Sequence, residues 1–160
     1  MQKAIFLDRD GIINTEIGHY ILREEDFCMN PGLVPFLKIM QSKGFIFIVI
    51  SNQGGVAKGL YTHQFLHTLH AKVKTLFQES GLPLLEIYYC PHHPDFGKCI
   101  CRKPDSLLVE KALARFKLDA ANCWFIGDAE RDIRAAAKAG VKGILVESNS
   151  NLELIAEKIT

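Results

Sequence analysis

Short apolar segments alternate along this chain with segments of helical periodicity, and this alternation limits the possible folds more than any other feature. The apolar segments are predicted as strands, at Lys3–Leu7, Phe45–Ile50, Leu84–Tyr89, Cys123–Ile126 and Gly143–Val146. An unbroken apolar run such as the second is typical of a strand that is buried on both faces. Strands of this kind that alternate with helices form a parallel sheet covered by helices. The sequence therefore predicts an α/β fold with a doubly wound parallel sheet.

The helices between these strands are predicted from apolar residues that recur every three or four positions. The first should open after Pro31-Gly32 and bury one face, which consists of Leu33, Phe36, Leu37 and Met40. Thr62 can cap a long second helix. Two more helices are expected near 106–116 and 131–139, and Asn151 can cap a last one.

The composition fits a single domain over residues 1–160, because an apolar fraction of 48% allows a sizeable core. The net charge of +1 creates no strong attraction for nucleic acid, so we expect no nucleic-acid partner. The first residues, Met1–Ala4, lack the layout of a signal peptide, and no apolar run approaches the length of a membrane span. We expect a cytoplasmic protein without a membrane partner, and a monomer.

Two carboxylates stand where the first predicted strand stops, in the run Asp8-Arg9-Asp10-Gly11. Side chains two apart on a strand point to the same side, so Asp8 and Asp10 could share a hard cation, which prefers oxygen ligands. The alternative is an ordinary strand-ending turn with solvated acids. The partners that other strand ends bring to the same edge distinguish the two interpretations, because ligands of such sheets bind beyond the carboxyl ends of the strands.

Polar groups do follow the other predicted strands. The second strand ends in Ser51-Asn52-Gln53, followed by two glycines, and these hydroxyl, amide and backbone N–H groups can cradle an anion. Asp128 follows the fourth strand and is placed to be a third oxygen ligand, while Arg102 and Lys103 bring two cations to the same rim. Taken singly, these are a glycine-rich turn, a helix cap and a solvated surface pair. Together they form the set that phosphoryl transfer needs.

The cysteines indicate a second kind of chemistry. There are five, an odd number, and three of them cluster, which favours a metal site or free thiols over a disulfide framework. Cys90, His92, Cys99 and Cys101 supply three thiolates and one imidazole, a complete zinc set of the structural type. The alternative is a loop of free thiols.

The sequence resembles haloacid-dehalogenase-type phosphatases at four ordered motifs, namely Asp8-Arg9-Asp10-Gly11, Ser51-Asn52, Lys103 and Gly127-Asp128. Within that superfamily, the loop from Tyr89 to Pro104 resembles the D-glycero-D-manno-heptose 1,7-bisphosphate phosphatases, and the related histidinol-phosphate phosphatases carry a similar loop. The resemblance implies a Rossmann-like domain without a separate cap domain, a catalytic magnesium ion, a structural zinc ion and a covalent aspartyl-phosphate.

The resemblance also implies roles for the acids. Asp8 is the nucleophile that attacks phosphorus. Asp10 is the general acid that protonates the leaving alkoxide and then the base that activates water. Magnesium should be held by the carboxylates of Asp8 and Asp128 and by the backbone carbonyl of Asp10.

The remaining site residues should hold the substrate. The transferring phosphoryl group should contact Ser51, the segment Asn52-Gln53 and Lys103, while Arg102 reaches the rest of the substrate. Family members also contact substrate in the region that corresponds to Glu16–Tyr20. Without a cap domain, the site should be open and should accept small phosphorylated metabolites.

The predicted function is magnesium-dependent removal of the C7 phosphate from D-glycero-D-manno-heptose 1,7-bisphosphate. Histidinol phosphate or another small phosphorylated metabolite is the alternative substrate. A phospho-accepting receiver domain has a similar sheet, but its acceptor follows the third strand, which here ends at Cys90. A zinc-loop interaction module would leave the acids at the strand ends unexplained.

Overall fold

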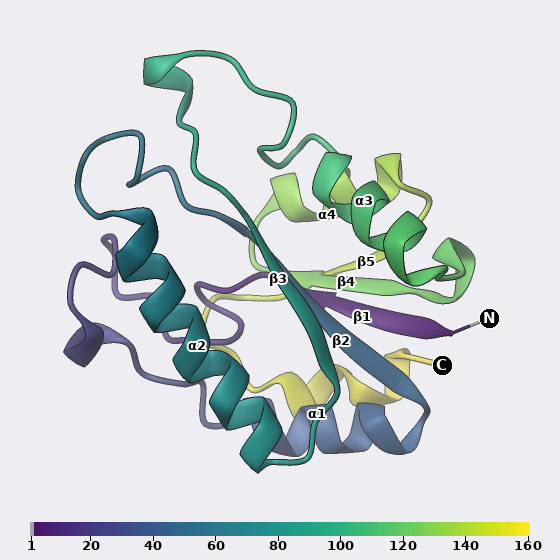
Figure 1. The fold of residues 1–160 in the computed structure, drawn as a ribbon. Helices are drawn as coiled ribbons and strands as arrows, with labels where there is room; N and C mark the ends of the chain where they lie inside the picture. Colours follow the sequence, from purple (N-terminus) through teal and green to yellow (C-terminus); the bar gives the residue numbers. More distant parts are fainter. Residues whose placement is uncertain (1) are drawn as a thin grey trace.

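The computed structural model describes residues 2–160, which form the predicted parallel sheet (Figure 1). Its strands are β1 (Lys3–Leu7), β2 (Phe45–Asn52), β3 (Leu84–Cys90), β4 (Trp124–Gly127) and β5 (Lys142–Leu145). Every pairing between them is parallel, and the strand order is β3-β2-β1-β4-β5. The predicted α/β class is therefore confirmed.

Four α-helices connect these strands. They are α1 (Leu33–Ser42), α2 (His63–Glu79), α3 (Leu107–Phe116) and α4 (Glu130–Lys138). Shorter 3-10 segments are η1 (Glu24–Asp26), η2 (Pro94–Phe96), η3 (Ala120–Asn122) and η4 (Leu152–Lys158). The last predicted helix is thus a 3-10 helix, and the Asn151 side chain caps it by accepting from the Glu153 N–H at 3.1 Å. No helix in the described part of the chain is long and apolar enough to cross a membrane.

The two faces of the sheet bury two separate apolar clusters, one under α1, α2 and η4 and the other under α3 and α4. Figure 1 shows α1 and α2 on one face of the sheet and α3 and α4 on the other. Alternate residues of β1 divide between them, since Ile5 and Leu7 join the first cluster while Ala4 and Phe6 join the second. This is the pattern of a strand that is covered on both sides.

The helices pack against these faces through the apolar residues that the sequence predicted to be buried. In α1 the buried residues are the predicted Leu33, Phe36, Leu37 and Met40. Burial of each such side chain contributes roughly 1.5–3 kcal/mol. The Thr62 side chain caps α2 by accepting from the Phe65 N–H at 3.1 Å. Helix α2 also buries one polar residue, His70, in its apolar stripe.

The strand order reverses between β1 and β4, since the chain continues from β1 toward β3 on one side and from β4 to β5 on the other. Loops diverge at such a point and leave a crevice beyond the strand ends. The loops that follow β1 and β4 approach each other closely at Gly11, whose φ is +87°. A Cβ added to this residue would lie 2.1 Å from the Asp128 carboxylate. Only glycine suits that conformation and that space.

Candidate active site

Three carboxylates converge at this reversal point. Asp8 follows β1, Asp128 follows β4 and Asp132 lies in the first turn of α4. Each offers one oxygen, and these oxygens lie within 4.8 Å of one another. Asp8 and Asp132 are buried and Asp128 is half-buried. Asp132 has no predicted role at the site, although it follows Asp128 by only four residues.

Lys103 neutralises part of this charge from a buried position. Its Nζ lies 2.8 Å from Asp8 Oδ1, 2.7 Å from Asp132 Oδ1 and 2.9 Å from the Ile50 carbonyl. Burial alone would lower the pKa of Lys103, but the charges of Asp8 and Asp132 outweigh burial and raise that pKa. The lysine therefore stays a cation between two acids. Burial raises the pKa of Asp8 to about 7, against the opposing charge of Lys103.

The acid group has the chemistry of a divalent-cation site. Carboxylate oxygens are the ligands that Mg²⁺ prefers in proteins. Asp132 Oδ1 is buried, and the Lys103 ammonium lies 2.7 Å from it. A cation beside these acids would also favour the ionised form of Asp8. The residues present therefore fit magnesium.

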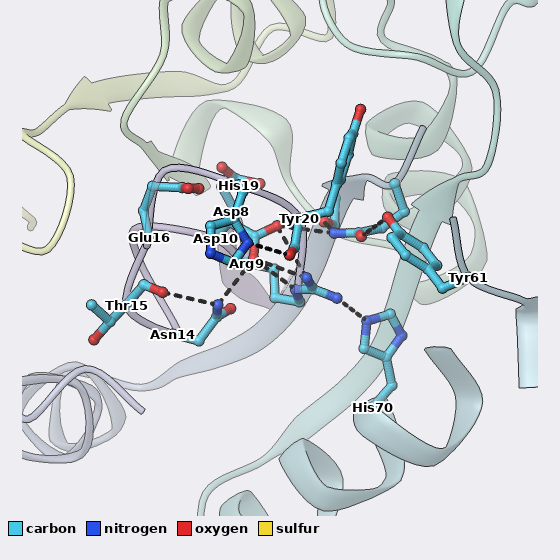
Figure 2. Close-up of polar contacts among 12 residues, drawn as sticks. Asp8, Arg9, Asp10, Asn14, Thr15, Glu16, His19, Tyr20, Tyr61 and His70 are labelled. Carbon is cyan, nitrogen blue, oxygen red and sulfur yellow. Dashed lines mark hydrogen bonds and ion pairs between the residues drawn. The ribbon is translucent and has the colours of Figure 1, made fainter. Parts of the chain in front are cut away.

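The Asp10 carboxylate lies outside this group and has its own partners (Figure 2). The chain leaves the strand after Leu7, so the alternation expected for Asp8 and Asp10 does not extend to Asp10. Arg9 Nη2 donates to both Asp10 oxygens, at 2.8 and 3.1 Å, and Asn14 Nδ2 donates at 2.9 Å. Burial opposes ionisation, but Arg9 and these hydrogen bonds outweigh it and lower the pKa of Asp10.

The residues at the end of β2 make hydrogen bonds to Lys103 and Asp10 of the site. Ser51 is buried and its Oγ accepts from Gln53 Nε2 at 2.8 Å. The Asn52 side chain makes two hydrogen bonds to the backbone of Lys103. Asn52 Nδ2 donates to the Lys103 carbonyl at 3.1 Å, and the Lys103 N–H donates to Asn52 Oδ1 at 3.0 Å. Gln53 is also buried, and its amide contacts Asp10 instead of lining a cleft. These contacts fix the positions of Lys103 and Asp10.

A cleft of about 340 Å³ opens above the acids. Its walls include three aspartates, three arginines and part of the segment from Glu16 to Ile21. The aspartates are Asp8, Asp10 and Asp128, and the arginines are Arg9, Arg102 and Arg131. Figure 2 shows Glu16, His19 and Tyr20 around the acids, where the sequence predicted substrate contacts. The volume suits a small metabolite. Arg102 Nη1 donates to the His92 carbonyl at 2.9 Å and so joins the cleft to the Cys/His loop.

The predicted zinc residues come together at the end of β3. The ligand atoms of Cys90, His92, Cys99 and Cys101 all lie within 4.8 Å of one another. Neighbouring atoms are 3.0–3.7 Å apart, as between Cys101 Sγ and Cys90 Sγ or Cys90 Sγ and Cys99 Sγ. Tetrahedral zinc with Zn–S bonds of about 2.3 Å would separate its sulfur ligands by roughly 3.8 Å. The donor set fits a structural zinc ion, and the 3.7 Å pair has the spacing of zinc ligands, while the 3.0 Å pair would have to move apart.

The sheet order, the acids at the reversal point and the lysine beside them define a haloacid-dehalogenase-like hydrolase. In agreement, a family model described as HAD-hydrolase-like matches residues 100–158.

Similar proteins that match nearly the whole chain define a narrower family within this class. A D-glycero-beta-D-manno-heptose-1,7-bisphosphate 7-phosphatase of Helicobacter pylori is 39% identical, over 90% of this chain and 83% of that protein. The enzyme of the same name from Pseudomonas putida is 35% identical, over 91% and 83%. A crystal structure of the D,D-heptose 1,7-bisphosphate phosphatase from B. bronchiseptica, complexed with magnesium and phosphate, superposes with a TM-score of 0.84 at 30% identity and covers 98% of this chain and 87% of that one. The chain belongs to the D-glycero-D-manno-heptose-1,7-bisphosphate 7-phosphatase family, and it is a phosphatase.

Sequence reasoning missed several residues around Asp10, namely Arg9, Asn14, Tyr61 and His70. Their contacts depend on how loops and α2 pack together. The one available signal was the position of His70 on the same helical face as Leu69 and Val73.

Proposed function

We propose that this phosphatase removes the C7 phosphate of D-glycero-D-manno-heptose 1,7-bisphosphate through a phosphoryl group carried on Asp8. The observation that carries the proposal is the position of Asp8, which lines the cleft, contacts Lys103 and shares a cation-type site with Asp128. The names of the relatives supply the substrate. Both alpha and beta anomers occur among those names, so the proposal covers the two anomers.

In the first step Asp8 attacks phosphorus, a P–O bond to the carboxylate forms, and the bond to the sugar oxygen breaks. Asp10 gives a proton to the leaving alkoxide, so its carboxyl must take up that proton from water when the substrate is bound, against the lowered pKa that Arg9 gives it in the free protein. In the second step Asp10 takes a proton from water as that water attacks phosphorus, which releases inorganic phosphate and restores Asp8. Asp10 lines the cleft, so its carboxylate is on the side that the substrate enters.

The transferring group is stabilised by charge and by N–H donors. Lys103 supplies a buried cation, Ser51 supplies a hydroxyl, and the Asn52 backbone supplies an N–H group. Magnesium held by Asp8, Asp128 and the Asp10 carbonyl would offset the charge of the phosphoryl oxygens. Asp132 helps to place Lys103, which lies 2.7 Å away.

We further propose that zinc occupies the Cys/His group and that Arg102 binds the second phosphate of the substrate. A guanidinium can bind a phosphate through two parallel hydrogen bonds. Arg102 lines the cleft one residue before Lys103, at the end of the loop that Cys99 and Cys101 would anchor. This position suits a group beyond the scissile phosphate.

The test compares catalytic efficiencies on both anomers of the heptose bisphosphate, on the heptose monophosphates and on histidinol phosphate. We expect kcat/KM to be highest for a bisphosphate, with inorganic phosphate released from C7. Equal or higher efficiency on histidinol phosphate would reassign the substrate while leaving the phosphatase class intact.

A further inference from the structure

Two side chains outside the four motifs reach Asp10, each through one intermediary. The Tyr61 hydroxyl donates to Gln53 Oε1 at 2.6 Å, and Gln53 Nε2 donates to Asp10 Oδ2 at 3.0 Å. In a second chain of contacts, His70 Nε2 lies 3.2 Å from Arg9 Nη1, and the same guanidinium holds Asp10 through Nη2. Figure 2 shows Tyr61 and His70 to the right of Asp10, with Arg9 between Asp10 and His70.

Tyr61 determines which way the Gln53 amide faces. With Oε1 held by the phenol, both N–H donors of the amide are directed at Asp10 Oδ2 and Ser51 Oγ. If the amide were reversed, an oxygen would face a carboxylate, which is repulsive. The phenol ring itself has little freedom, because a Cβ on Gly55 would lie 2.2 Å from it.

His70 acts on Arg9 in a similar way. A guanidinium has only donors, so the ring nitrogen that faces it must be the unprotonated one. Burial, together with the charge of Arg9, lowers the pKa of His70 to about 3, so the ring remains a neutral acceptor at physiological pH. Arg9 and His70 are both buried, at 2% and 5% exposure, so water cannot easily replace either partner.

We propose that Tyr61 and His70 are positioning residues that hold the Asp10 carboxylate in one orientation at the wall of the cleft. The inference rests on the proposed function, because it requires Asp10 to be the general acid. Tyr61 acts through Gln53 and His70 acts through Arg9. Loss of either should therefore weaken the step in which Asp10 protonates the leaving group.

The test uses two leaving groups. An alkyl phosphate needs its leaving oxygen protonated, whereas p-nitrophenyl phosphate, whose leaving group is stable as an anion, needs little help. The quantity to measure is the ratio of kcat/KM for heptose bisphosphate to kcat/KM for p-nitrophenyl phosphate. The ratio does not depend on the fraction of folded enzyme, so a purely structural defect leaves it unchanged.

In Tyr61→Phe we expect the ratio to fall about three- to tenfold, the range for one net hydrogen bond. Tyr88→Phe is the matched control. It also removes one phenol hydroxyl, which contacts Arg115 at 3.0 Å and belongs to the cluster on the opposite face of the sheet. A wild-type ratio in Tyr61→Phe would overturn the role of Tyr61.

At His70 the test is rescue by a conservative variant. Gln can place an amide oxygen close to the position of the imidazole Nε2, whereas Leu removes the acceptor. We expect His70→Leu to lower the ratio about three- to tenfold and His70→Gln to restore most of it. Equal ratios in these two variants would overturn the role of His70.

Asp10→Asn separates this inference from the proposed function. If Asp10 is the acid, that variant should lower the ratio by more than Tyr61→Phe does, toward the roughly 10²–10⁴-fold typical of general-acid catalysis. An unchanged ratio in Asp10→Asn would overturn the role of Asp10 and the inference with it. A low ratio in Asp10→Asn beside a wild-type ratio in Tyr61→Phe and His70→Leu would overturn the positioning role alone.

Discussion

Asp8, Asp128 and Asp132 come from two strand ends and a helix, whereas the Cys/His group lies within one stretch of chain, Cys90–Cys101. Asp8 and Asp128 follow strands that are mostly buried, Asp132 lies in α4, and Lys103 already joins Asp8 to Asp132. After Cys90, the Cys/His loop has one short 3-10 turn, η2, and exposes Phe96 and Ile100 at 66% and 73%. The fold alone therefore positions the acid group, whereas we expect the loop to need a bound zinc ion for its order. This difference predicts that loss of magnesium lowers activity and that loss of zinc lowers stability.

The largest effect is expected at the acid group. Asp8→Asn should abolish turnover, by on the order of 10⁴-fold or more, because an amide cannot act as the nucleophile. The fold should persist, since Asn keeps the size of the side chain. Phosphate release and circular dichroism measure the two properties. Wild-type turnover in a pure preparation would contradict the mechanism.

Magnesium removal should separate activity from folding. Brief treatment with EDTA should stop phosphate release and leave the circular dichroism spectrum unchanged, because the core and Lys103 hold the acids in place and the structural zinc should exchange more slowly than magnesium. Added Mg²⁺ should restore the rate. Activity that survives verified removal of magnesium would contradict the assignment of the acid group.

Arg102→Ala should affect one substrate more than another. Loss of a charged contact to the second phosphate should cost ~1.5–3 kcal/mol, or about tenfold to a hundredfold in kcat/KM for the heptose bisphosphate. A small aryl phosphate lacks the second phosphate and should lose far less. Lys103→Ala should reduce both rates, because that lysine contacts the nucleophile. Equal losses on the two substrates in Arg102→Ala would show that Arg102 does not select substrate.

Loss of zinc from the Cys/His loop should lower the stability of the protein. Elemental analysis should find about one zinc ion per chain, and Cys99→Ser should lose it. We expect that variant to lose about 2 kcal/mol, or about 4–8 °C in Tm, because the metal contributes folding free energy. Cys28→Ser, an exposed cysteine outside the loop, is the control. Protein purified without chelators that contains no zinc would contradict the site.

The smallest effect, for a change of one pH unit, concerns His70. Its pKa is lowered to about 3 in the folded protein, against about 6.5 in an unfolded chain. Between these values the unfolded chain binds a proton that the folded protein does not, so the stability that His70 contributes is lost as pH falls below about 6.5. Unfolding free energies of wild type should fall by up to about 1.4 kcal/mol per pH unit more steeply than those of His70→Gln. Parallel pH profiles would mean that the imidazole is not held neutral.

Local patterns predicted most of the fold, since strand and helix identities follow from apolar spacing and caps such as Thr62. They predicted β2 too short, because Ser51 and Asn52 are polar but still pair with Tyr89 and Cys90 of β3. In the site, Asp8, Lys103 and Asp128 could be expected together, because parallel strand ends meet at one edge. The partners of Asp10 could not be predicted, because arginine and histidine are usually at least partly solvent-exposed and only the tertiary packing shows that Arg9 and His70 are buried.

The central claim is that Asp8 carries the phosphoryl group during turnover. The direct measurement is rapid acid quench of Asp10→Asn during reaction with p-nitrophenyl phosphate, whose leaving group needs little protonation, followed by peptide mass spectrometry. That variant should accumulate phosphoenzyme, because the base that activates water is missing. We predict one added phosphoryl group on the peptide that contains Asp8, located at Asp8 by fragmentation. A phosphoryl group on any other residue would contradict the account.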